Sequence, residues 1–505
     1  MAIALLAAIL FAAAQAAPDP CDSLTIVQAR AALVALRAAE LAHRGPSGGA
    51  FRITYEGSRA LEAHLMRPGM VYTTPVRLEL DLGPTSPSLP PALAIRESAG
   101  PKDPPRTTIT TRNRAARQTS SDAPFIELTA PESSQAAADA ARWFPAAVAA
   151  AGLAAGPTCR PGAPIEGDGS TLTPIAFTDA SGSTVSVFVD DQHRIARIEV
   201  LAADQRLGDV CNWVVFGHWQ QREGRWIPGT IGRFTVRSST TERYDLTLVD
   251  AAPSDFAGSL PPPHLADIAT WNQPEAPGGI EFIPLGQSLW SVEVAAADSR
   301  ILLIERRDDL VLLGAPDGDE VCTSLLSSLS ARFPSKPHGL VALSHHHPSP
   351  AGGLRALAAR GATILIPTRL EPFVRALLAR PATLGGPAVP GPAEPRLSLF
   401  DDQTTIEGTD VRCIDIGEHS AHAFCYVVFY FPEPGIIYEH DLGYFPAAGQ
   451  PRFTPRLAGL VDQLAAAGIQ PQRLIQAWPV KRTLPEIPWS TVADLARAAR
   501  EAGSR

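Results

Sequence analysis

The 505-residue sequence lacks a block of basic residues, and after its first twenty residues it has no transmembrane-length segment free of charges and proline. About 20 consecutive apolar residues are needed to cross a bilayer, so we expect no membrane span in the mature protein. With a net charge of -9 and no basic block, neither nucleic acid nor an anionic membrane surface is an expected partner. A phosphate-binding glycine loop with lysine and a dinucleotide fingerprint are also missing, which argues against nucleotide-dependent chemistry.

The first residues, MAIALLAAILFAAAQAAPDP, form an apolar run that ends in small residues, with Ala14 and Ala16 spaced as an A-x-A cleavage site. This pattern predicts a secretory signal peptide over residues 1–17, and therefore a periplasmic or secreted protein. Six cysteines fit an oxidising compartment. Cys413 and Cys425, in apolar runs on either side of a loop, are the expected local disulfide; the others are predicted either to pair or to be buried thiols.

The length and the 45% hydrophobic content predict two domains. Residues 18–250 are expected to form a mostly antiparallel, β-rich α+β domain, with a helix over 22–44, a helix over 136–153 kinked or split at Pro145, and a long loop over 84–123. Residues 251–278 contain six prolines and few apolar runs, which is typical of a linker. Residues 279–505 form the second predicted domain and begin with four short strands.

The segment from Gly339 to Pro367, GLVALSHHHPSPAGGLRALAARGATILIP, organises the second domain. Two apolar runs flank a helical pattern closed by glycine, which predicts a parallel strand–helix–strand unit. Three consecutive histidines follow the first apolar run. They are therefore placed at the carboxyl end of a buried strand, where open α/β sheets bind their ligands.

A strand that ends in Ser-His-x-His and continues through Gly-Gly-Leu into a helix resembles the metal-binding loop of the metallo-β-lactamase fold superfamily, HxHxDH followed by GG. His345 and His347 match the first two histidines, whereas Ser349 and Pro350 replace the Asp and the third His. The resemblance implies an α/β fold, an αββα metallo-β-lactamase-like sandwich over residues 279–505. It also implies an exported protein with a β-rich domain ahead of the sandwich, as in poorly characterised members of the superfamily.

The resemblance also implies the remaining ligands. His422 precedes an apolar strand as the family's third histidine does, with His419 as the alternative, and Asp441 follows the next strand at the position of the metal-bridging carboxylate. The resemblance thus implies one zinc ion held by His345, His347 and His422. Asp441, also the retained catalytic residue, either closes the shell as a fourth metal ligand, which makes the site structural, or stays outside it and leaves a position for water. The second metal site has lost its other ligands, since the last family histidine falls near Trp478 and Pro479.

Two functions follow from this pattern. The first is a metal-dependent hydrolase with at most a mononuclear zinc site, acting on a small-molecule substrate of unknown identity. Its base would be Glu439, His440, His346 or His419, because the family's base is missing at Ser349. The second is a catalytically inactive binding or scaffolding protein that retains the fold. If they are not the base, we expect His346 to face solvent or to support the metal ligands without binding the ion, and His440 to be an ordinary surface or interface residue.

Overall fold

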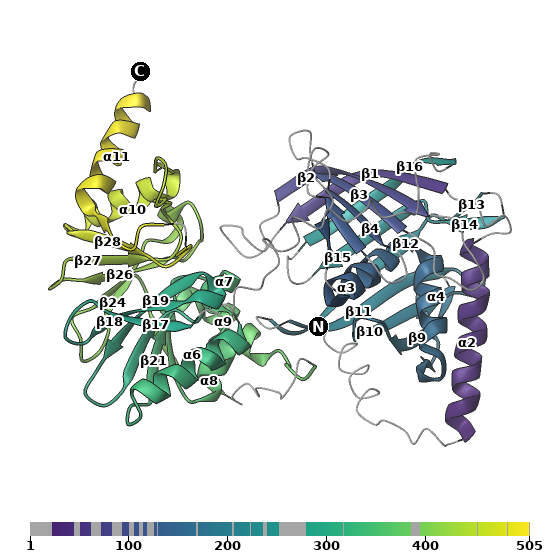
Figure 1. Ribbon diagram of the computed structural model, residues 1–505, viewed down its shortest axis with the longest axis horizontal. Helices are drawn as coiled ribbons and strands as arrows, with labels where there is room; N and C mark the ends of the chain where they lie inside the picture. The colour runs from purple at the N-terminus through teal and green to yellow at the C-terminus, as the bar shows by residue number, and fades with distance from the viewer. Residues whose placement is uncertain are drawn as a thin grey trace. The chain divides into compact units, whose positions relative to one another are not determined.

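The computed structural model divides the chain into two compact units, an amino-terminal one and a carboxy-terminal one that contains Gln273–Arg505 (Figure 1). The residues described are 23–44, 51–61, 72–82, 93–99, 106–110, 115–118, 126–128, 130–167, 170–204, 207–222, 224–235, 240–251, 279–316, 318–384, 394–451, 453–481 and 483–503. The predicted signal peptide and almost all of the predicted linker lie outside these residues. None of the helices in the described residues is long and apolar enough to cross a membrane.

The amino-terminal unit is built on one antiparallel sheet with the strand order β6-β5-β4-β3-β2-β1-β16-β15-β12-β11-β10-β9-β7, with β8 paired to β9 and a separate β13–β14 hairpin. Its strands are β1 Phe51–Leu61, β2 Tyr72–Leu82, β3 Leu93–Ala99, β4 Arg106–Thr110, β5 Ala115–Gln118, β6 Ile126–Glu127, β7 Arg160–Pro161, β8 Ile165–Gly167, β9 Ser170–Thr178, β10 Thr184–Val189, β11 Ile195–Asp204, β12 Gly208–Gly217, β13 Gln220–Arg222, β14 Arg225–Ile227, β15 Thr230–Thr235 and β16 Thr240–Ala251. The antiparallel β-rich prediction is therefore confirmed for this unit.

Three helices pack against this sheet: α2 Ser23–Arg44, α3 Ala130–Ala141 and α4 Pro145–Ala155. Helix α3 contacts β3, β4 and β5 near one end of the sheet. At the other end, α2 contacts β7 and α4 contacts β9. The split at Pro145 is confirmed, because Pro145 is the first residue of α4, where its missing N–H removes no helical bond. The predicted loop over 84–123 is wrong, since β3, β4 and β5 pair there in register.

The carboxy-terminal unit contains two sheets, ordered β17-β18-β19-β20-β21-β22-β23 and β24-β25-β26-β27-β28-β29. The first comprises β17 Ile280–Pro284, β18 Leu289–Val294, β19 Ser299–Glu305, β20 Leu310–Leu313, β21 His338–Ala342, β22 Thr363–Pro367 and β23 Leu397–Phe400. The second comprises β24 Gln403–Thr405, β25 Arg412–Asp415, β26 Val427–Phe431, β27 Ile436–Glu439, β28 Arg473–Gln476 and β29 Ile487–Pro488. The four short strands predicted at its start are β17 to β20.

These sheets are the inner layers of a four-layer αββα sandwich (Figure 1). Alternation along β19 shows why: Leu302 and Ile304 pack toward the second sheet, whereas Ile301 and Leu303 pack toward the helices. The outer helices that cover the first sheet are α6 Asp319–Arg332, α8 Leu354–Ala359 and α9 Glu371–Ala379. Those that cover the second sheet are α10 Pro455–Ala466 and α11 Trp489–Gly503. Both faces of each sheet are therefore dry, and the predicted fold class is confirmed.

The glycine pair after the histidines has a packing role. A Cβ added to Gly353 would lie 2.6 Å from Cβ of Cys322 on α6 and 3.1 Å from the carbonyl oxygen of Pro316. Only glycine therefore lets the chain approach α6 this closely before it enters α8. β21 and β22 pair in parallel on either side of this connection, as the sequence predicts.

The predicted Cys413–Cys425 disulfide is wrong. Cys413 and Cys425 are both buried free thiols, as are Cys159 and Cys322, while Cys211 is a half-buried one. Cys413, on β25, packs between the two sheets, whereas Cys425 packs with the helices of the first sheet. Cys425 Sγ instead donates to Oδ2 of Asp415 at 3.2 Å. Side chains that enter different core layers are not positioned to form a disulfide.

Candidate metal centre

The end of β21 supplies the first two histidines. β21 ends at Ala342, and the chain then runs through His345 to His347, the residue that precedes the short helix α7 Pro348–Ala351. Both imidazoles are buried, and their ring centroids lie 4.5 Å apart. The carbonyl oxygen of Ser344 accepts a hydrogen bond from Val427 N at 2.6 Å, which fastens this loop to the start of β26 in the second sheet.

A tight turn before β26 supplies the third histidine. Ser420 Oγ accepts hydrogen bonds from His422 N at 3.1 Å and Ala423 N at 3.0 Å, while Ala421 adopts a left-handed φ of 48°. This turn directs His422 inward, with its ring centroid 5.0 Å from that of His345 and 4.5 Å from that of His347. His419, the alternative third ligand, is exposed on the 3₁₀ turn that precedes it.

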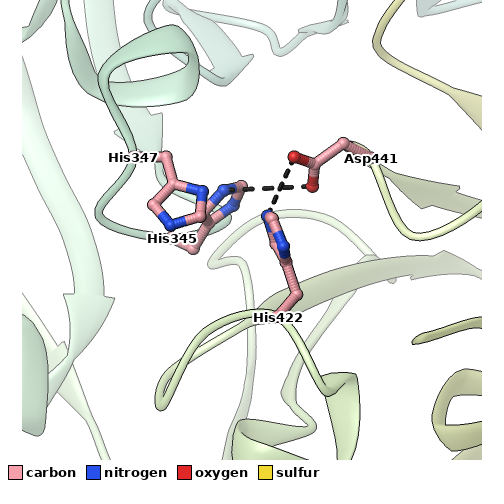
Figure 2. Close-up of side chains that lie close together, drawn as sticks. All are labelled: His345, His347, His422 and Asp441. Carbon is pink, nitrogen blue, oxygen red and sulfur yellow. Dashed lines mark ion pairs between the residues drawn. The ribbon is translucent and has the colours of Figure 1, made fainter. Parts of the chain in front are cut away.

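Asp441 follows β27 and closes the cluster. One ligand atom from each of His345, His347, His422 and Asp441 lies within 4.8 Å of the others. Figure 2 shows the carboxylate of Asp441 facing the histidines, with Oδ2 2.9 Å from His422 Nε2 and Oδ1 3.9 Å from His345 Nε2. The structure thus brings together all four residues that the sequence singled out.

The electrostatics of the cluster suit ligation of a cation. Burial lowers the pKa of His345 well below its ordinary value, so its imidazole is neutral, the form that binds metals. Burial alone would raise the pKa of Asp441, but His345 and the close approach of His422 hold it well below its usual range. The site therefore offers the neutral imidazole of His345 and the ionised carboxylate of Asp441 at neutral pH.

The side chain of Tyr426 contacts two residues of the cluster, His345 and Asp441. Its ring stacks on His345, with centroids 4.7 Å apart and planes inclined by 18°. Its hydroxyl oxygen accepts hydrogen bonds from His440 N and Asp441 N, both at 3.0 Å, and lies 3.1 Å from Asp441 Oδ1. Burial raises the pKa of this phenol well above its ordinary value, so the hydroxyl keeps its proton. Our sequence interpretation missed Tyr426, because nothing in the pattern before β26 separates it from a core aromatic residue.

Ser349 and His440 contact each other beside the cluster. Ser349 Oγ lies 3.2 Å from Nε2 of His440, within hydrogen-bond distance. His440 is only 6% exposed, so it is not a surface residue, the first of the two places expected for it. Its ring centroid lies 5.5 Å from that of His345, so it borders the four-residue cluster. Pro350 offers no donor atom that could bind a metal.

Glu439 and His346, two other candidate bases, do not have the protonation state or the position that a general base needs. Glu439 is fully buried, and burial raises its pKa to about 8, so it is protonated at neutral pH. Its Oε2 accepts a hydrogen bond from Leu442 N at 2.6 Å, which holds the turn after Asp441. His346 is 7% exposed, so it does not face solvent, and its ring lies against Phe373 and Phe424, with its centroid 4.7 Å from that of His347. His440 is the candidate base that remains beside the cluster.

The donor set fits a zinc ion. Three imidazoles and one carboxylate are ligand types that zinc takes in four-coordinate sites. Nε2 of His345 is buried without a hydrogen-bond partner, which is the state expected of an atom that has a metal ligand role. Ser344 Oγ lies 2.9 Å from Nδ1 of the same ring and can accept a hydrogen bond from Nδ1–H, which leaves the Nε2 lone pair available.

No protein-family model matches the chain, and no curated protein matches its sequence. Among solved structures, a metallo-β-lactamase of Pseudomonas aeruginosa in its mono-zinc form is 16% identical, with a TM-score of 0.34, over 45% of this chain and 96% of that one. A metallo-β-lactamase of Erythrobacter litoralis is 18% identical, with a TM-score of 0.33, over 44% and 97%. A LolA superfamily protein of Nitrosomonas europaea is 10% identical, with a TM-score of 0.31, over 46% and 94%.

The fold of the carboxy-terminal unit is identified from its own sheets and from the four-residue cluster. Two mixed sheets face each other between outer helices, and the four-residue cluster lies where loops after β21 and β27 meet the turn before β26. These features define a metallo-β-lactamase-like fold with a His₃Asp cluster.

Proposed function

We propose that this protein is a metal-dependent hydrolase of the metallo-β-lactamase fold with a single zinc site. The observation that carries the proposal is the convergence of His345, His347, His422 and Asp441, whose ligand atoms lie within 4.8 Å of one another. A single ion is proposed because Ser349 and Pro350 stand where a second ion needs a carboxylate and an imidazole. Ser349 Oγ is engaged with Nε2 of His440 instead.

In this proposal the four residues of the cluster would hold a zinc ion, which would supply Lewis acidity. Lowering the pKa of a water molecule to about 7 would require a fifth coordination position or the withdrawal of Asp441 from the ion, because four protein ligands fill a tetrahedral shell. The chain's own residues orient the reaction. Asp441 stays ionised against the histidines, and Tyr426 keeps its carboxylate in place. Burial lowers the pKa of His440, so its imidazole is neutral at pH 7 and can accept a proton at Nε2, next to the Ser349 hydroxyl.

The substrate in this proposal is a small molecule with a hydrolysable ester, amide or phosphoester bond. We assign no β-lactam substrate, because a shared fold does not fix the reaction. We also propose that the protein is exported, on the basis of the apolar amino-terminal run and its A-x-A site. Sequencing the amino terminus of protein recovered from the cell envelope and the medium tests this: a start at residue 18 is expected, and an intact Met1 would contradict it.

Metal analysis tests the proposed site. Untagged protein should retain about one zinc per chain after dialysis, and the H345A/H347A double variant should retain none. H218A, H193A and H419A are controls that remove imidazoles outside the cluster. Equal metal content in the wild type and the double variant would refute the site.

Hydrolysis is a separate test. Zinc-loaded protein is screened against chromogenic esters, amides and phosphoesters, beside H347A. Turnover that zinc restores and H347A abolishes supports a hydrolase, whereas equal turnover in H347A would contradict it.

The hydrogen-bonded Ser349–His440 pair also favours a second candidate, a metal-holding binding protein without hydrolytic activity. A carboxylate at position 349 would be the general base of the family pattern, and a serine hydroxyl has no basicity to replace it. This candidate predicts one bound zinc with no turnover of any of these substrate classes. Hydrolysis at enzymatic rates would exclude it.

A further inference from the structure

Tyr426 contacts two of the four cluster residues through two different parts of its side chain. The ring lies nearly parallel to the imidazole of His345 at a centroid distance of 4.7 Å, and the hydroxyl lies 3.1 Å from Oδ1 of Asp441. The ring and the hydroxyl thus reach one ligand from each sheet, because His345 follows β21 and Asp441 follows β27. Tyr426 itself is fully buried and directly precedes β26.

The hydrogen bonds of the hydroxyl have a single consistent assignment. A phenol oxygen has one proton to donate and can accept two hydrogen bonds. The N–H groups of His440 and Asp441 fill both acceptor positions, so the proton goes to a carboxylate. Asp441 Oδ1 at 3.1 Å is nearer than Glu439 Oε2 at 3.3 Å, and Oε2 already accepts from Leu442 N at 2.6 Å.

The hydroxyl therefore fixes both the backbone and the carboxylate of Asp441. With Oδ1 held by Tyr426, Oδ2 is the oxygen that faces His422 at 2.9 Å. A charge-assisted hydrogen bond of this kind restricts rotation of the carboxylate and sets which oxygen is presented to an ion. Partners that orient metal ligands in this way commonly change metal affinity by roughly 10- to 100-fold when they are removed.

We infer that Tyr426 is a positioning residue of the metal centre, which orients Asp441 through its hydroxyl and supports His345 through its ring. The inference rests on the proposed zinc site. It assigns to Tyr426 no contact with substrate or with the ion itself. Its effect passes through Asp441, and this makes it separable from a general contribution to folding.

Tyr438 provides a matched control. It is also a buried tyrosine of the same sheet, on the neighbouring strand β27, and its hydroxyl donates to the carbonyl oxygen of Arg300 at 2.9 Å. Replacing either tyrosine with phenylalanine removes one buried hydroxyl and leaves the ring. Only Y426F removes a hydrogen bond to a cluster residue, so differences between the two variants report on the site.

The experiment measures zinc affinity by competition with a chromophoric chelator, and the visible absorption spectrum of the Co²⁺-loaded protein, for the wild type, Y426F, Y438F, D441A and D441A/Y426F. We expect Y426F to bind zinc roughly 10- to 100-fold more weakly and to show an altered Co²⁺ spectrum. Y438F should bind within about twofold of the wild type, because its hydrogen-bond partner lies outside the cluster. In the D441A background, Y426F should have no further effect of that size, because its target is gone.

Zinc affinity and a Co²⁺ spectrum unchanged in Y426F would overturn the inference while leaving the zinc site intact. An equal loss in Y438F, or a full additional loss in D441A/Y426F, would show that the hydroxyl acts on the fold and not through Asp441. A Y426F protein that does not fold while Y438F does would count against the inference for the same reason. Failure of the wild type to bind zinc would refute the proposed site, and with it this role.

Discussion

Nε2 of His422 lies 2.9 Å from Oδ2 of Asp441, so a residue of the turn before β26 contacts a residue that follows β27. The two side chains share the buried space between the sheet ends with His345 and His347 (Figure 2). Asp441 is thus the one carboxylate of the four-residue cluster, and its charge offsets that of any cation held there.

Replacing Asp441 with asparagine should therefore weaken zinc binding strongly. The variant keeps the shape of the side chain but removes its charge, so we expect a loss in affinity larger than the roughly 10- to 100-fold seen when a ligand's supporting partner is removed. Isothermal titration calorimetry or chelator competition measures it. D401N is the matched control, because Asp401 is an exposed carboxylate of the same unit that accepts a hydrogen bond from Thr368. Equal affinities of D441N and D401N would contradict a ligand role.

Ser349→Ala should leave the zinc content unchanged, because we assign Ser349 to a hydrogen bond with His440 and not to the metal. The lost hydrogen bond should lower the free energy of unfolding by about 1 kcal/mol. Metal analysis and a thermal melt of the same preparation check both values. A drop in zinc per chain to the level of the H345A/H347A variant would instead make Ser349 a ligand.

Gly353→Ala should destabilise the carboxy-terminal unit by about 1–3 kcal/mol, because its Cβ would lie 2.6 Å from Cβ of Cys322. Gly286→Ala is the control, since the nearest atom to a Cβ there is Cβ of Leu289 at 4.0 Å. Urea denaturation compares the two variants. If both lose the same stability, the close approach to α6 is not what requires glycine after the histidines.

The stability of the amino-terminal unit should fall as the pH drops from about 6.5 to about 4, because of His43. Burial lowers its pKa to about 4, although the nearby Asp190 raises it and Arg194 lowers it further. Nε2 accepts a hydrogen bond from Ile195 N at 3.0 Å, which leaves Nδ1 to donate to the carbonyl oxygen of Trp226 at 3.2 Å. The folded state thus needs the neutral ring, whereas the unfolded chain takes up a proton near pH 6.5.

The stabilisation from neutral His43 is fully present above pH 6.5, and about 3 kcal/mol of it is lost by pH 4. Urea denaturation at several pH values, followed by hydrogen exchange of peptides from 23–44, measures this loss. H43Q cannot titrate, so its stability should depend less on pH over the same interval. An identical pH dependence in H43Q and the wild type would assign the effect to other groups.

Much of the fold could be predicted from local patterns. The apolar runs around the histidine loop, Pro145 at the start of α4 and the four strands that open the second unit are all visible in the sequence, because strand and helix periodicity and proline geometry act over a few residues. The pairing of β3, β4 and β5 was missed, because these strands interrupt a Pro- and Ser-rich region with little periodicity of its own.

The sequence pattern was enough to place His345 and His347 at the carboxyl end of a buried strand, and the family resemblance implied Asp441 after a later strand. The choice between His422 and His419 depended on the folded turn that Ser420 closes, and the packing of the two sheets placed Cys413 and Cys425 in separate core layers. The roles of Tyr426 and of the Ser349–His440 pair also depend on contacts between segments far apart in the chain. Such contacts form only when both sheets pack, and no local pattern of residues encodes them.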